Sequence, residues 1–251
     1  MASSPMFSFV LVDLTTDATP AAMKPAGAFP NFIAAWLEQI NGPFAAAWGA
    51  VRVAFRIATG PADRLTSEVA INFRDSIPEA PGALAYHEVV NGVPDVELGV
   101  DLFASLATGA ESVSVGGSHE ILELMGDAGA NGWKTRLDGV TADASEVCDF
   151  VEGAFAAASN GVAVSDFLCP SFFIPGAAGP WDWLNVMQSQ YDVSNGYGIT
   201  AQVGGEAQIG GGGMKAARAV LAVEGEKMSD ASRRRKRSAY SRATRRGLRA
   251  A

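Results

Sequence analysis

Residues 51–57 read VRVAFRI and residues 68–74 read EVAINFR, and in both segments large apolar side chains occupy every second position. Alternation of this kind is typical of a strand that buries one face. Between residues 32 and 44, by contrast, aromatic and aliphatic side chains recur three or four positions apart, which predicts an amphipathic helix over 31–47. The combination predicts an α+β domain in which this helix packs on a mainly antiparallel sheet.

Similar patterns continue along the chain. Short apolar runs predict further strands at 7–14, 85–90 and 96–100, and helical spacing predicts helices at 112–125 and 146–158. Glycines at 204–205 and 210–213 predict a flexible joint, because glycine populates many backbone conformations. We therefore expect three parts: a domain at 1–205, a glycine-rich joint with a short helix at 206–232, and a basic tail at 233–251.

Composition excludes several classes of protein. With 48% hydrophobic and 18% charged side chains among 251 residues, the chain can build a real core and is neither disordered nor a coiled coil. It has no apolar run of about 18 residues, so we expect no membrane span and no membrane partner. The first 17 residues lack a positively charged start and predict a strand, not a signal peptide. Two cysteines make no disulfide framework.

The net charge of −8 hides two electrostatically different parts. Residues 214–251 hold twelve lysines and arginines against three acids, whereas the remainder holds seven basic and 24 acidic side chains. The last 19 residues carry nine basic side chains and too little apolar surface to fold alone. Two partners suit them, nucleic acid or an acidic protein surface such as a neighbouring copy. The nine candidate binding residues are Arg233, Arg234, Arg235, Lys236, Arg237, Arg242, Arg245, Arg246 and Arg249.

The segment from Ser118 to Glu123, SHEILE, is the strongest chemical signal. On a helix, His119 and Glu123 lie one turn apart on one face and can hold a divalent cation. Glu120 lies about 100° round the helix, where it can act as a general base on a metal-bound water without binding the metal. This is the logic of the H-E-x-x-H helix with the second His replaced by Glu.

A third ligand must come from elsewhere in the chain. The segment 146–152 supplies acids at helical spacing, and either Glu146 or Asp149 can complete the site. The protein has only two histidines, His87 and His119, so a site with three His ligands is excluded. We expect His87 to be structural, with a pocket-lining position opposite His119 as the alternative.

These residues carry a resemblance to little-characterised zincin-like proteins of bacteria and tailed phages, and more distantly to the plant phosphate-induced (exordium-like) proteins. It covers roughly residues 7–175 and departs at Ala128, where the family pattern has Pro. It implies a metallopeptidase-like fold with Glu146 as the third ligand and Asp149 as the carboxylate that orients a ligand, or the reverse. The positions that carry it are Ala47-Trp48-Gly49, Tyr86-His87, Ser118–Glu123, Asp127, Trp133, Glu146, Asp149 and Gly161–Pro170.

Two hypotheses for function follow. The first is a phage-encoded zincin-like metallopeptidase with Zn²⁺ as the expected ion. Two carboxylates and one imidazole cancel the charge of that ion and also suit Mn²⁺ or Ca²⁺. The second is a non-catalytic phage virion protein, associated with capsid or tail, whose basic tail binds nucleic acid, other structural proteins or itself. Either hypothesis places the protein in the virion or the host cytoplasm.

Overall fold

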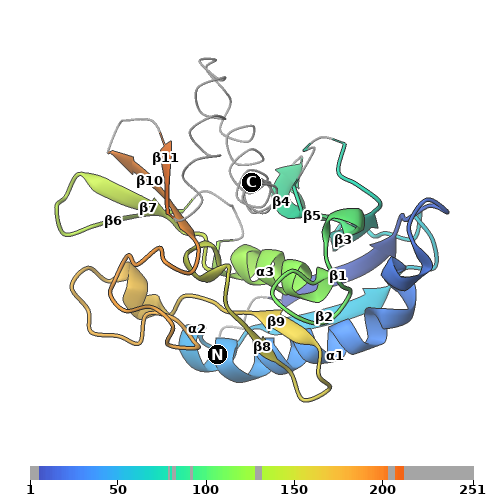
Figure 1. The fold of residues 1–251 in the computed structure, drawn as a ribbon, viewed down its shortest axis with the longest axis horizontal. Helices are drawn as coiled ribbons and strands as arrows, with labels where there is room; N and C mark the ends of the chain where they lie inside the picture. Colours follow the sequence, from blue (N-terminus) through green and yellow to red (C-terminus); the bar gives the residue numbers. More distant parts are fainter. Residues whose placement is uncertain are drawn as a thin grey trace.

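The largest sheet of the described residues has five strands in the order β2-β1-β3-β5-β4 and lies on one side of helix α3 (Val113–Gly126) (Figure 1). The computed structural model describes residues 6–78, 80, 83–90, 93–127, 132–202 and 207–211. Within them no helix is long and apolar enough to cross a bilayer. The strands of this sheet are β1 (Met6–Asp13), β2 (Arg52–Ile57), β3 (Val69–Arg74), β4 (Ala85–Val90) and β5 (Val93–Gly99).

The direction of these strands differs from the sequence prediction. β1 runs parallel to both β2 and β3, and β3 runs parallel to β5, so only β4 is antiparallel to its neighbour. The prediction of a mainly antiparallel sheet was therefore wrong for this sheet. The physical reason is the connection between β1 and β2, which contains a helix and returns the chain to the same end of the sheet.

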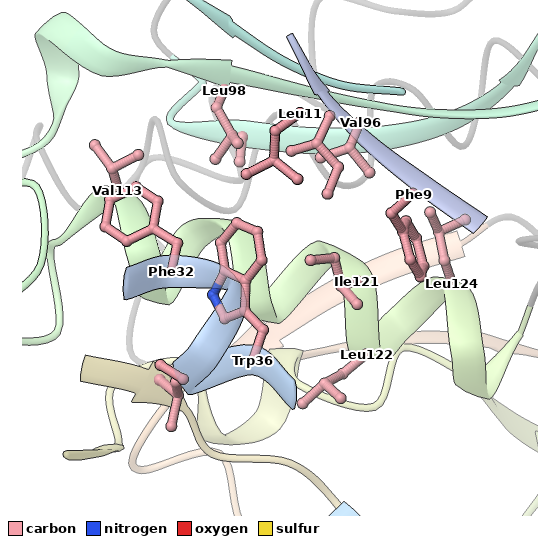
Figure 2. Close-up of a cluster of buried hydrophobic side chains, with 14 of the residues drawn as sticks. Phe9, Leu11, Phe32, Trp36, Val96, Leu98, Val113, Ile121, Leu122 and Leu124 are labelled. Carbon is pink, nitrogen blue, oxygen red and sulfur yellow. The ribbon is translucent and has the colours of Figure 1, made fainter. Parts of the chain in front are cut away.

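Two helical segments cover one face of the sheet. The first comprises α1 (Phe29–Gln39), a π-helical turn at Ile40–Phe44 and α2 (Ala45–Trp48), which confirms the helix predicted over 31–47. The second is α3 (Val113–Gly126), which confirms the helix predicted over 112–125. Figure 2 shows side chains from α1, α3 and the strands meeting in one core, with Trp36 between the two helices and the sheet.

Helix α3 is buried along almost its whole length. The Ser112 side chain caps it by accepting a hydrogen bond from the backbone N–H of Val115. Two successive glycines let the neighbouring rings approach the helix, because a Cβ on Gly117 would lie 2.5 Å from Cζ2 of Trp36. A Cβ on Gly116 would similarly lie 2.6 Å from Cζ of Phe103. The polar side chains of α3 are therefore held in the interior.

The remaining strands form two smaller antiparallel sheets. One has the order β11-β10-β7-β6 and the other pairs β8 with β9. These strands are β6 (Trp133–Thr135), β7 (Thr141–Ala144), β8 (Phe155–Ala157), β9 (Ala163–Ser165), β10 (Tyr197–Gln202) and β11 (Ala207–Gly211). Short 3-10 turns lie at Ala21–Met23, Ala26–Ala28, Val100–Leu102 (η4), Asp149–Val151 (η5) and Pro170–Phe173.

Two further sequence predictions can be compared with the structure. The helix predicted over 146–158 was wrong, because this segment forms a loop, the turn η5 and strand β8. Strand β11 pairs with β10, so the sheet extends past residue 205 into the glycine-rich segment. The rest of the predicted joint after residue 211 and the whole basic tail, 233–251, lie outside the described residues.

Candidate metal centre

Helix α3 brings His119 and Glu123 into close contact. Nε2 of His119 lies 2.9 Å from Oε1 of Glu123, and the two residues are only 2% and 1% exposed. Oε1 of Glu123 nevertheless forms no hydrogen bond among the described residues. A close approach of nitrogen and oxygen without a hydrogen bond is the arrangement of two ligands that face a common cation.

The turn η5 adds a second carboxylate beside His119. Oδ1 of Asp149 lies 3.4 Å from Nε2 of His119, and the same oxygen accepts a hydrogen bond from the hydroxyl of Tyr197 on β10. Strand β10 comes close to η5 because Gly196 has no side chain, and a Cβ there would overlap the carbonyl oxygen of Asp149. Residues far apart in the sequence are thereby fixed around one imidazole.

Strand β4 contributes His87 from the edge of the large sheet. His87 pairs with Val96 of β5, a core residue, and cross-strand partners share a face, so His87 faces α3. Its Nδ1 lies 2.9 Å from Oε2 of Glu120 and 3.4 Å from Oε2 of Glu123. Its Nε2 lies 3.8 Å from Oε2 of Glu146, in the loop after β7.

The expectation that His87 is structural did not include these contacts, and the alternative of a position opposite His119 is closer to the structure. The alternation along β4 held a usable signal, because it places His87 on the same face as Ala85 and Val89. What the sequence could not supply was the position of α3 beneath that face.

The structure brings all five predicted chemical residues together, in two groups. Asp149 lies beside His119, whereas Glu146 lies beside His87, and Glu123 contacts both histidines. Glu120 is fully buried against His87. The spacing of Glu146 and Asp149 does not reflect a helix, since both belong to a loop and a turn.

Burial dominates the electrostatics of the cluster. It raises the pKa of Glu123 to about 8, with the carboxylates of Glu146 and Glu120 adding to the effect. Burial and the neighbouring Glu123 also raise the pKa of Asp149 well above its usual range. Burial opposes the charged form of His87, but its contacts with Glu120 and Glu123 raise its pKa well above 6.5. Without a cation, the cluster therefore retains protons that a metal would displace.

The donor set and spacing fit a divalent cation. Zinc bonds of about 2.0–2.1 Å in tetrahedral geometry separate neighbouring ligand atoms by roughly 3.3 Å. The contacts of His119 Nε2, at 2.9 Å and 3.4 Å, lie on either side of that value. Oε1 of Glu123 and Oε2 of Glu146 are buried and make no hydrogen bond with any described residue. Both oxygens are therefore available to bind a cation.

No lysine or arginine of the described residues forms an ion pair with Glu123, Glu146 or Asp149. The arginines pair elsewhere, with Asp63, Glu68, Asp95, Glu97 and Asp143. Buried carboxylates are ionised only where a compensating charge is present, and a bound cation would supply it.

Two other residues complete the surroundings. Cys148 is fully buried, and its Sγ lies close enough to His119 and Glu123 for a shared ion. Burial raises the pKa of its thiol well above 9.

His119 and Glu152 also line a small pocket whose other walls include apolar side chains of Leu84 and Phe103. His119 therefore belongs both to the buried cluster and to the lining of this pocket.

No family model, no curated protein and no solved structure matches the chain.

Proposed function

We propose that this protein is a zincin-like metal-binding protein that hydrolyses peptide bonds. The observation that carries the proposal is the buried contact between His119 and Glu123 on α3, with Asp149 beside the imidazole. The resemblance of the SHEILE segment to zincin-like proteins, and the donor set around it, support the same conclusion. Zn²⁺ is the expected ion, held by His119, Glu123 and a carboxylate from the 146–149 segment.

In this proposal the chain holds the cation and positions one base. A bound divalent cation polarises a carbonyl group and makes water more acidic. Glu120 accepts a proton from the attacking water and later returns it to the leaving amine. His87 hydrogen-bonds Oε2 of Glu120, which fixes the direction of that carboxylate. The small pocket beside His119 has room for about one water molecule, which in this proposal is the attacking one.

A digestion experiment with matched variants tests the proposal. The zinc-loaded full-length protein is incubated with a peptide library, and cleavage is compared with that by Glu120→Gln at equal metal content. We expect the variant to keep its metal and to lose at least about 100-fold in rate, which is the usual contribution of a positioned base. The control is Glu88→Gln. Glu88 follows His87 on β4 and pairs with Asp95, so it lies on the opposite face of the sheet from His87.

Two results would contradict this assignment. Loss of metal in Glu120→Gln would make Glu120 a ligand. If the wild-type protein binds metal but cleaves no peptide, the peptidase assignment is wrong and the non-catalytic function described next is favoured.

The second candidate is a non-catalytic phage virion protein in which the ion is structural. The observation that favours it is burial, since His119, Glu120 and Glu123 are at most 2% exposed. The arginine-rich tail, Arg233–Arg249, suits contacts with nucleic acid or with the acidic body of a neighbouring copy. Deletion of 233–251 followed by measurement of DNA retention and self-association across a salt series tests this role, with loss of either property as the expected result.

A further inference from the structure

The carboxylate of Glu123 presents its two oxygens to two different histidines. Oε1 lies 2.9 Å from Nε2 of His119, and Oε2 lies 3.4 Å from Nδ1 of His87. A single ion at His119 uses only Oε1. His87, Glu123 and Glu146 offer one donor atom each, and these atoms all lie within 4.8 Å of one another.

We propose that the site binds a second divalent cation, held by His87, Glu146 and Oε2 of Glu123, so that Glu123 bridges two ions. This inference rests on the proposed ion at His119 and extends it to a two-metal centre. In a peptidase, a metal centre of this kind would hold the attacking water and polarise the carbonyl oxygen of the substrate.

Charge balance supports two ions. Glu120, Glu123, Glu146 and Asp149 are each at most 8% exposed and carry four negative charges when ionised. One divalent ion cancels two of these charges, and two ions cancel all four. A single ion leaves two of these buried carboxylates to be neutralised by bound protons, whereas two ions allow all four to be ionised.

The surroundings of His87 fit the role of a ligand. A metal-binding histidine usually donates its other ring N–H to a carboxylate, which fixes the orientation of the ring. Nδ1 of His87 has such a partner in Oε2 of Glu120, 2.9 Å away. Nε2 is then left for the cation, on the side where Oε2 of Glu146 lies 3.8 Å away and makes no hydrogen bond with any described residue.

Metal stoichiometry tests the inference. Full-length protein freed of metal is titrated with Zn²⁺, and bound metal is measured by mass spectrometry after gel filtration. We expect two equivalents for the wild type and for the control Glu88→Gln. His87→Gln and Glu146→Gln should each retain one equivalent, which is the ion at His119. His119→Gln should also retain one equivalent, which is the ion at His87.

A spectroscopic measurement on the wild type complements these variants and does not depend on their folding. Two Mn²⁺ ions bridged by one carboxylate, about 3.5–4 Å apart, couple magnetically, so loading with Mn²⁺ should give a coupled electron paramagnetic resonance spectrum. In His87→Gln the spectrum should become that of an isolated ion.

The outcomes separate this inference from the proposed function. The wild type could bind one equivalent that is lost in His119→Gln but kept in His87→Gln. This result would overturn the second site and leave the first, and a protonated His87 would then take the place of the second ion. Two equivalents that persist in His87→Gln would also overturn it, because the second ion would then lie elsewhere. A protein that binds no Zn²⁺ would overturn both.

Discussion

The hydroxyl of Tyr197 donates a hydrogen bond to Oδ1 of Asp149, across 48 positions of sequence. This contact joins strand β10 to the turn η5 beside His119. Burial raises the pKa of the Tyr197 hydroxyl well above 10, with the negative charge of Asp149 adding to the effect. The phenol therefore remains a donor at all physiological pH values and orients a carboxylate that faces the candidate metal.

Tyr197→Phe removes this donor without changing the shape of the ring. We expect the affinity for Zn²⁺ to fall about 10- to 100-fold, which is typical of losing a partner that orients a ligand. Competition with a zinc-chelating dye measures the affinity, and circular dichroism should show an unchanged fold. Tyr191→Phe is the control, because Tyr191 packs near η5 in the same hydrophobic cluster, whereas the hydroxyl that donates to Asp149 is that of Tyr197. Equal affinities of wild type and Tyr197→Phe would remove Tyr197 from the site.

Gly117→Ala should destabilise the protein. The added Cβ would lie 2.5 Å from the ring of Trp36, whose Nε1 donates a hydrogen bond to the carbonyl oxygen of Ser114. Overpacking of this kind typically costs about 1–3 kcal/mol, measured as the free energy of unfolding in urea. Gly42→Ala is the control, because a Cβ at this exposed helical position meets nothing within 4 Å. A Gly117→Ala protein as stable as wild type would contradict the close packing of α3 on Trp36.

Asp166 gives a prediction for pH. Burial and the neighbouring Asp182 raise the pKa of Asp166 to about 8, although its Oδ1 accepts hydrogen bonds from the N–H groups of Phe167 and Leu184. Between pH 4 and pH 8 the folded state keeps a proton that the unfolded state releases. The free energy of unfolding should therefore fall as pH rises through this window, by up to about 1.4 kcal/mol per pH unit from this group.

Asp166→Asn removes that proton but keeps the oxygen that accepts both hydrogen bonds. We expect the variant to gain stability over wild type as pH rises from 5 to 8, measured by urea unfolding at each pH. The control is Asp192→Asn, since backbone hydrogen bonds from Gln188 and Ser194 lower the pKa of Asp192. A constant difference between Asp166→Asn and wild type across this range would contradict the raised pKa.

Periodicity in the sequence was enough to predict the elements that carry the core. Alternation over 51–57 and 68–74 corresponds to β2 and β3, and helical spacing over 32–44 corresponds to α1 and the turn after it. These patterns are local, because each one records the spacing of apolar side chains along a single element. They did not show that β3 is buried on both faces.

The relations between elements could not be predicted in the same way. Parallel pairing of β1 with β2 depends on the path of the connecting chain, and no alternation pattern encodes it. Acids at 146, 149 and 152 have helical spacing, but they are buried by the neighbouring strands in a loop and a turn. His87 reaches the cluster because β4 pairs with β5 at the edge of the sheet above α3, which is a tertiary relation.

Anomalous diffraction at the zinc absorption edge, from crystals of the full-length protein soaked in Zn²⁺, tests the metal centre most directly. We predict a peak within about 2.0–2.2 Å of Nε2 of His119 and a carboxylate oxygen of Glu123. The matched Glu123→Gln crystal, soaked identically, should lose that peak. If wild-type crystals soaked in saturating Zn²⁺ show no anomalous peak beside His119, the proposed metal centre is contradicted.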